Sequence, residues 1–267
     1  MNALILYFSG TGNTRNAAGE FRSGLLKRGY SVAMHSTEEK IDLTKIPYDV
    51  LLVGFPKYYE YPLLPMLQYL KRNLPKSEKP VPTLAFCTQA GGLKTDFSGL
   101  GRLLRKKNHR LTVGVSFPYA NNMMIFKAFH ATEPAELAAN RENIRKQIDP
   151  LLDDFLAGKE RSEQTKAWQR PLIFLVAKSC YHVMPAFFMR FSADESCTGC
   201  GLCAKRCPRK NIRMENGHPV FQKHCLFCMR CINACPVNAI RYGGQKCRQY
   251  RCEPFTNPAE PKKEELS

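Results

Sequence analysis

Residues 197–208 read CTGCGLCAKRCP, and residues 225–236 read CLFCMRCINACP. In each stretch two residues separate successive members of a cysteine triplet, three residues lead to a fourth cysteine, and a proline follows. The stretches are offset by 28 residues, from Cys197 to Cys225. The following residues repeat too, as CPRKNIRM at 207–214 and CPVNAIRY at 235–242. The pattern indicates an internal duplication of a cysteine-rich unit.

Cysteines at this spacing favour an iron–sulfur site. Thiolates at i, i+3 and i+6 can each take one iron of a [4Fe–4S] cubane in one tight loop. The fourth cysteine of each stretch cannot reach the same cubane, so it ligates the cluster held by the other triplet. Zinc sites normally use pairs of cysteines, not triplets. The chain shows no secretory signal peptide, so its 12 cysteines are expected to stay reduced in the cytoplasm. We predict a cytoplasmic protein with two [4Fe–4S] clusters.

Residues 193–243 resemble the two-cluster bacterial ferredoxins. On that pattern one cluster takes Cys197, Cys200, Cys203 and Cys235. The other takes Cys225, Cys228, Cys231 and Cys207. The resemblance also implies that Ile212 and Ile240 cover the clusters.

Other candidate ligands lie outside the repeat. Cys247 and Cys252 are predicted to be free thiols, because no further ligands accompany them. Cys87 and Cys180 stand in apolar contexts and are predicted to be buried packing residues. His224, beside the second triplet, is interpreted as a surface residue or a neighbour of a ligand.

Residues 1–158 show alternating strand and helix patterns. The predicted strands cover residues 3–8, 31–35, 49–55, 81–88 and 111–117. The predicted helices cover residues 14–28, 63–74, 95–108 and 134–157. Short apolar strands joined by helical crossovers predict a doubly wound α/β domain with a parallel five-stranded sheet.

A polar loop joins the first predicted strand to the first helix. Its residues are Ser9, Gly10, Thr11, Gly12, Asn13 and Thr14. Backbone N–H groups at a helix N-terminus bind anions, and hydroxyls can donate to a phosphate. The loop lacks the Gly-Lys-Ser/Thr of a P-loop, and Arg15 replaces the third glycine of a dinucleotide fingerprint.

This loop resembles the phosphate loop of flavodoxins, and the resemblance spans residues 1–158. It implies the strand order 2-1-3-4-5, with FMN at the carboxyl ends of the strands. It also implies two segments along the flavin ring. The first is Pro56, Lys57, Tyr58 and Tyr59, and the second is Thr88, Gln89, Ala90, Gly91 and Gly92. Tyr58 or Tyr59 would stack on the ring, and Lys57 is either solvated or a cation near the ring edge.

The remaining segments divide as follows. Residues 159–191 are predicted to be a linker and an apolar inter-domain segment, residues 192–245 the cluster domain and residues 246–267 a tail. Charged and kinking residues interrupt the apolar part, 171–191, and argue against a transmembrane helix. Packing between the domains is the favoured interpretation, and peripheral membrane contact is the alternative.

The formal charge of +17 falls to about +11 once the clusters and a flavin phosphate are counted. No basic motif with interleaved aromatic residues accompanies it, so nucleic-acid binding is not indicated. The simplest interpretation of the charge is a solvated basic surface, and the alternatives are an anionic membrane surface or an acidic redox protein partner, such as a ferredoxin or flavodoxin.

The whole chain resembles the flavodoxin–ferredoxin fusion proteins of anaerobic microbes. This implies an electron carrier that relays low-potential electrons between two [4Fe–4S] clusters and FMN. Two alternatives stay open: a flavin-dependent reductase of a small substrate or quinone, and an iron–sulfur module of a redox complex whose flavodoxin-like domain is empty. No acid–base dyad or nucleophile triad is visible, so no catalytic residue is predicted.

Overall fold

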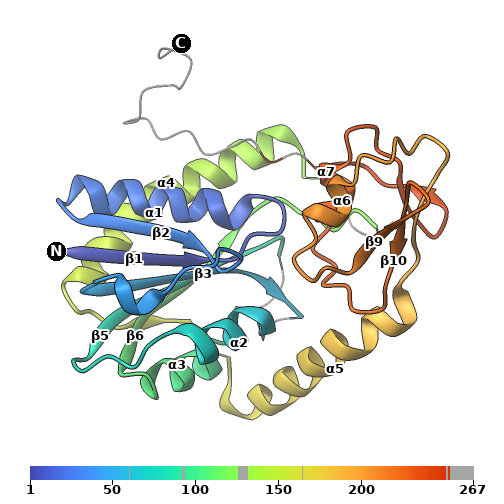
Figure 1. The fold of residues 1–267 in the computed structure, drawn as a ribbon. Helices are drawn as coiled ribbons and strands as arrows, with labels where there is room; N and C mark the ends of the chain where they lie inside the picture. Colours follow the sequence, from blue (N-terminus) through green and yellow to red (C-terminus); the bar gives the residue numbers. More distant parts are fainter. Residues whose placement is uncertain (60, 92–93, 126–131, 164, 251, 253–267) are drawn as a thin grey trace.

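In a computed structural model, the chain forms an α/β domain, a long helix α5 and a smaller cysteine-rich domain (Figure 1). The structure describes residues 1–59, 61–91, 94–125, 132–163, 165–250 and 252. The predicted site residue Gly92 and, within the predicted tail, residues 251 and 253–267 lie outside these residues.

The α/β domain is built on one sheet with the strand order β2-β1-β3-β5-β6-β7. Its strands are β1 (Asn2–Tyr7), β2 (Ser31–Ser36), β3 (Val50–Tyr58), β5 (Val81–Gln89), β6 (His109–Pro118) and β7 (Arg161–Ser162). Neighbours along this path are parallel. The five predicted strands are therefore all present and take the order 2-1-3-4-5, as the flavodoxin resemblance implies.

Two short strands were not predicted. The β3 strand continues through Tyr58 and turns back into β4 (Tyr61–Pro62), so part of the expected ring loop is a hairpin. The β7 strand falls in the expected linker and pairs with the outer edge of β6. The Glu163 N–H extends this pairing by donating to the Gly114 carbonyl at 2.9 Å. Strands of two residues carry no apolar periodicity, which explains why the sequence does not reveal them.

Helices cover both faces of the sheet (Figure 1). They are α1 (Asn13–Lys27), α2 (Leu64–Asn73), α3 (Ser98–Arg105) and α4 (Pro134–Leu156), and a 3-10 turn η1 spans Leu43–Lys45. Along β1, Ile5 joins the core beneath α1 and α4, whereas Leu4 and Leu6 join the core beneath α2 and α3. Burial on both faces explains why this strand is apolar throughout.

The cysteine-rich domain repeats its backbone as well as its sequence. Its elements are β8 (Phe191–Ala193), α6 (Leu202–Lys205), β9 (Ile212–Glu215), β10 (His218–Phe221), α7 (Arg230–Ala234), β11 (Ile240–Tyr242) and β12 (Gln245–Lys246). Strands β9 and β10 form one antiparallel pair, and β8, β11 and β12 form a second small sheet. Positive φ angles recur 28 residues apart at Gly199 and Phe227, at Gly201 and Met229, and at Lys210 and Asn238.

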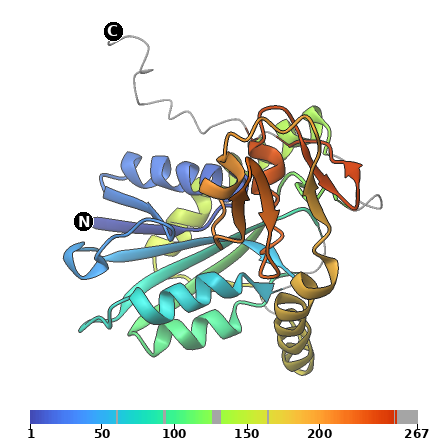
Figure 2. The same ribbon diagram turned by 45° about the vertical axis from the view of Figure 1, so that its right-hand side comes forward.

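The segment between the domains is one helix, α5 (Arg170–Phe188), preceded by a 3-10 turn η2 (Ala167–Gln169). Figures 1 and 2 show α5 running along the edge of the molecule from the α/β domain to the cysteine-rich domain. Only Ala177 and Pro185 of this helix are buried. The interpretation of this segment as packed between the domains is therefore wrong for most of its surface.

Candidate cofactor sites

The predicted phosphate loop is a tight turn between β1 and α1. Gly12 has a φ of 112°, a conformation that L side chains rarely adopt. Its N–H donates to the Ser9 Oγ at 3.1 Å. The Asn16 N–H donates to the Gly12 carbonyl at 2.9 Å and closes the first turn of α1. The loop therefore ends at a helix N-terminus, the arrangement that favours an anion.

Side chains fix this loop to its neighbours. The buried Thr14 and Thr88 hydroxyls are hydrogen-bonded at 2.8 Å, which joins the loop to the end of β5. The Asn122 amide donates to the Thr11 Oγ1 at 2.6 Å. Asn13 donates to the Ala120 carbonyl and accepts from the Tyr250 hydroxyl. The Asn13 side chain thus connects the segments of Ala120 and Tyr250. What Asn13 can offer an anion is therefore its backbone N–H.

A cavity of about 410 Å³ lies at the carboxyl edge of the sheet beside this loop. Predicted residues that line it are Ser9, Gly10, Thr11, Asn13, Thr14, Pro56, Lys57, Tyr58, Tyr59, Thr88, Gln89, Ala90 and Gly91. Lining residues that were not predicted are Ala120, Asn121, Asn122, Met123, Thr132 and Glu136. Gly12 is not among the lining residues. Residues 120–123 follow the end of β6, so the rule that places ligands at strand ends could have found them.

The walls of this cavity fit a flavin. Its volume is within the range of roughly 300–1,000 Å³ for small-molecule sites. The Gln89 Oε1 is buried and has no hydrogen-bond partner in the described part of the chain. A ring N–H would satisfy it. The Tyr58 and Tyr59 rings meet edge to face with centroids 6.4 Å apart, so the cavity has an aromatic wall.

The second cysteine triplet lies near the same wall. Burial raises the pKa of Tyr58, and the nearby Cys228 and Cys225 thiolates raise it further. An enclosed cavity brings Cys225, Cys228 and Cys231 together with Cys207. This is the ligand set that the ferredoxin resemblance implies. Ile212 also lines it, as expected for a residue that covers a cluster.

The chemistry of this enclosed cavity suits an iron cluster. Burial raises the pKa of Cys225 to about 12 and also raises that of Cys231. Buried thiols resist ionisation unless a metal cation stabilises the thiolate. Within the described ranges, no three Cys, His, Asp or Glu side chains meet closely enough for a single metal ion. A cubane spreads its thiolates over four irons and does not need that convergence.

The first triplet is the more open of the two. Cys200 is exposed, whereas Cys203 and Cys235 are buried. Burial raises the pKa of Cys203, and the neighbouring Cys197 and Cys200 thiolates add to the effect. The N–H groups that follow the two fourth cysteines donate to sulfur at 3.2 Å, from Asn211 to Cys207 and from Ala239 to Cys235. Hydrogen bonds to ligand sulfur tune the potential of a cluster.

The remaining cysteines and His224 have other surroundings. Cys87 is buried as predicted, but Cys180 is only half-buried on α5. Cys247 is buried, and its thiol is free. The Cys252 sulfur accepts from the Asn16 amide at 3.2 Å. His224 is exposed, consistent with its interpretation as a surface residue.

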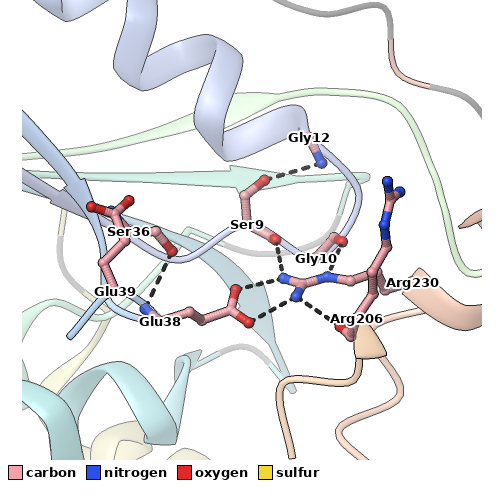
Figure 3. A network of polar contacts seen from close by, with 8 residues as sticks. All are labelled: Ser9, Gly10, Gly12, Ser36, Glu38, Glu39, Arg206 and Arg230. Atoms are coloured by element: carbon pink, nitrogen blue, oxygen red, sulfur yellow. Dashed lines mark hydrogen bonds and ion pairs between the residues drawn. The ribbon is translucent and has the colours of Figure 1, made fainter. Parts of the chain in front are cut away.

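Arg230 joins the second cysteine loop to the phosphate loop (Figure 3). It donates to the Gly10 carbonyl at 2.9 Å and to the Ser9 carbonyl at 2.7 Å. Two further bonds of 2.7 Å reach the Glu38 carboxylate. A Cβ on Gly10 would lie 2.9 Å from the Cys228 carbonyl oxygen, so the loops are in direct contact. The sequence does hold a signal for this contact, because the first repeat has Leu202 where the second has Arg230.

The start of the expected tail connects the domains at a second point. Gln249 donates to the carbonyls of Ile232 and Cys235 at 2.6 and 2.7 Å. The Tyr250 hydroxyl then donates to Asn13 of the phosphate loop at 2.7 Å. Residues 246–250, the start of the predicted tail, therefore bridge the two sites.

Comparison with known proteins identifies the cysteine-rich part of the chain. A family model described as a 4Fe-4S dicluster domain matches residues 189–236. The chain is 32% identical over 71 residues to NADH-quinone oxidoreductase subunit I 2 of Geobacter metallireducens, a match of 22% of this chain and 54% of the relative. It is 27% identical over 105 residues to an uncharacterized protein of Methanocaldococcus jannaschii, a match that covers 33% of this chain and 42% of the relative. The chain thus spans about half the length of the curated relatives it matches.

Solved structures similar to the chain include flavodoxins. One, from the domain Archaea, is 19% identical with a TM-score of 0.36, and the match covers 55% of this chain and 99% of that one. Oxidised flavodoxin 2 from Bacillus cereus is 14% identical with a TM-score of 0.39, and the match covers 58% of this chain and 99% of that one.

The sheet order and the cysteine domain define the class of the protein. It is an iron–sulfur protein in which a flavodoxin-like α/β domain precedes a 4Fe-4S dicluster domain. More particularly, the chain has the make-up of a flavodoxin–ferredoxin fusion.

Proposed function

We propose that the chain binds FMN in the cavity beside the phosphate loop and transfers electrons between this FMN and its two [4Fe–4S] clusters. When bound, the clusters exchange single electrons and the flavin exchanges one or two, so the combination connects one-electron and two-electron partners. The observation that carries the proposal is the direct contact between the second cysteine loop and the phosphate loop. Arg230 and the Gly10–Cys228 approach supply it.

The residues divide into holding and positioning roles. The backbone of the loop from Ser9 to Thr14 would hold the phosphate, and the Tyr58–Tyr59 wall with Gln89 would hold the ring. Cys207 and the second triplet would hold the cluster next to the flavin. Asn122, through its bond to Thr11, positions the hydroxyl side of the loop.

The first cysteine loop is suited to exchange electrons with other proteins. Its Cys200 is exposed, and so are the adjacent Lys205 and Arg206. Basic groups beside an exposed cluster attract acidic proteins and accelerate their association. We therefore propose acidic ferredoxins or flavodoxins as partners of this loop.

Anaerobic cofactor analysis tests the proposal. About eight irons with matching sulfide and one FMN per chain are expected, either as purified or after FMN is added. A chain that keeps its irons but binds no added FMN would overturn the flavin part. Zinc or about four irons would overturn the two-cluster part. Turnover of NAD(P)H or a quinone by the isolated protein would show that it is a reductase and not an electron carrier.

A further inference from the structure

We propose that α5 docks the protein onto an anionic membrane surface and lies in the plane of the interface. The helix carries an apolar face that no described segment covers. Leu172 is 59% exposed, Leu175 60%, Val183 49% and Phe187 73%. With Val176 they recur at helical spacing and form one stripe. We call these five residues the α5 stripe.

Both ends of the helix are suited to the boundary between water and lipid. Trp168 of η2, just before α5, is 70% exposed. Tryptophan prefers the headgroup level of a bilayer, because its ring is apolar and its N–H is polar. Arg190 is exposed just beyond the other end. The 19 residues of α5 span about 28 Å, long enough for a substantial contact along the surface.

The charge around the stripe selects an anionic partner. Residues 165–193 contain two lysines and two arginines and neither aspartate nor glutamate. Lys166, Lys178 and Arg190 are exposed, whereas Arg170 is ion-paired with Asp96 at 3.8 Å. Apolar faces bordered by cations are typical of helices that bind anionic lipid surfaces. A second copy is a poor occupant, because a symmetric contact would bring the same cations face to face.

The helix lies on the membrane and does not span it. By length and composition alone, Ala167–Phe188 is the one helix among the described residues that could cross a bilayer. Spanning would place the two domains on opposite sides of the membrane. The Arg230 bonds to Ser9 and Gly10 hold the domains against each other. They must therefore lie on the same side.

The opposite face of α5 already packs on the protein. Phe174 meets the Tyr61 ring with centroids 5.6 Å apart. The Tyr181 hydroxyl accepts from Arg209 of the cysteine-rich domain at 2.6 Å. Both domains thus fix the orientation of the helix and present the α5 stripe outward.

Vesicle binding by the full chain, loaded with its clusters, tests this proposal. Trp168 is the only tryptophan in the chain, so its fluorescence reports directly from the start of the helix. With vesicles of phosphatidylcholine and phosphatidylglycerol we expect co-flotation, a blue shift of this emission and quenching by brominated lipid. Binding to phosphatidylcholine alone is expected to be about tenfold weaker.

Matched variants identify the surface that binds. The double variant Leu175→Gln, Val183→Gln is expected to lose at least about tenfold in vesicle affinity. Lys178→Glu is expected to weaken only the binding to anionic vesicles. Val237→Gln, at a 42% exposed apolar residue of the other domain, is the control and should bind as the unmodified protein does. Iron content and circular dichroism verify that each variant is folded.

Three results would overturn the proposal. The first is the absence of flotation with any vesicle while the protein is folded. The second is equal binding by the stripe variant and the Val237 control. The third is a stable dimer in light scattering that the stripe variant converts to a monomer, without any vesicle binding, because it would show that a second copy covers the stripe.

Discussion

Replacing Arg230 with glutamine is expected to weaken FMN binding without removing a cluster ligand. The guanidinium is 18% exposed, and it bonds to two carbonyls of the phosphate loop and to Glu38. Charged hydrogen bonds contribute about 1.5 kcal/mol each at the lower end, so the two carbonyl bonds account for about 3 kcal/mol. The Glu38 pair is discounted to at most about 1 kcal/mol, because that carboxylate is 32% exposed.

Only part of this loss appears as FMN affinity. If bound FMN must restore about 1.4 kcal/mol of the lost order in the loop, the Kd rises about tenfold. The measurement is anaerobic titration of flavin-free protein by quenching of FMN fluorescence, with iron determined on the same sample. The iron content separates loss of a cluster from loosening of the loop.

Two matched variants sharpen the result. Glu38→Gln removes the ion pair but leaves the two carbonyl bonds of Arg230, and we expect less than about a threefold change in Kd. Arg213→Gln removes an exposed arginine of the same domain and serves as the control. The Arg230 variant, the Glu38 variant and the protein that carries both substitutions form a double-mutant cycle with the unmodified protein. FMN affinity unchanged in Arg230→Gln, with all irons retained, would refute the argument that this arginine couples the two sites.

Three further perturbations have defined outcomes. The double variant Lys205→Glu, Arg206→Glu is expected to slow reduction of the clusters by an acidic ferredoxin about tenfold at low salt in stopped-flow absorbance, with the difference vanishing at high salt. An equal slowing at every ionic strength would contradict it. Gly12→Ala is expected to destabilise the loop by about 1–2 kcal/mol in thermal unfolding, because its φ is 112° and its Cβ would lie 2.9 Å from that of Cys252. Burial lowers the pKa of His109 in the folded protein. The free energy of unfolding is therefore highest above about pH 6.5, and it decreases at lower pH because the unfolded chain takes up the proton more readily. A His109→Gln variant with the same pH slope would show that another group is responsible.

The sequence predicts the sheet and the cysteine ligands because each depends on local patterns. The strand around Leu4–Leu6 is apolar on both faces, and the SGTGNT loop follows it directly. The cavity that brings Cys207 to the second triplet follows from the spacing and the ferredoxin pattern. Such features need few long-range contacts to be recognised.

Other features depend on contacts that no local pattern encodes. The β7 strand exists because the edge of β6 offers free backbone groups to Arg161–Ser162. Tyr250 reaches Asn13 across 237 residues of sequence. The exposure of α5 is of the same kind, because an apolar run predicts burial until the packing around it is known.

The duplicated cysteine loops differ in sequence because only the second packs against the α/β domain, and this difference supports the proposal that the second cluster faces the flavin. Positions 199 and 201 of the first loop are glycines with positive φ, whereas positions 227 and 229 of the second are Phe227 and Met229. A non-glycine residue in that conformation costs about 1–2 kcal/mol.

Burial compensates for this cost. Phe227 is 3% exposed and Met229 is 2% exposed, and burying such a side chain contributes about 1.5–3 kcal/mol. Leu226, at the position of Thr198 in the first loop, joins the core of the α/β domain together with Cys228. The second loop has apolar residues because it is buried on both sides: Phe227 and Met229 fill the core of the cysteine-rich domain, and Cys228 packs against the phosphate loop. The first loop keeps small and polar residues around an exposed Cys200, which supports the proposal that its cluster is the one that exchanges electrons with other proteins.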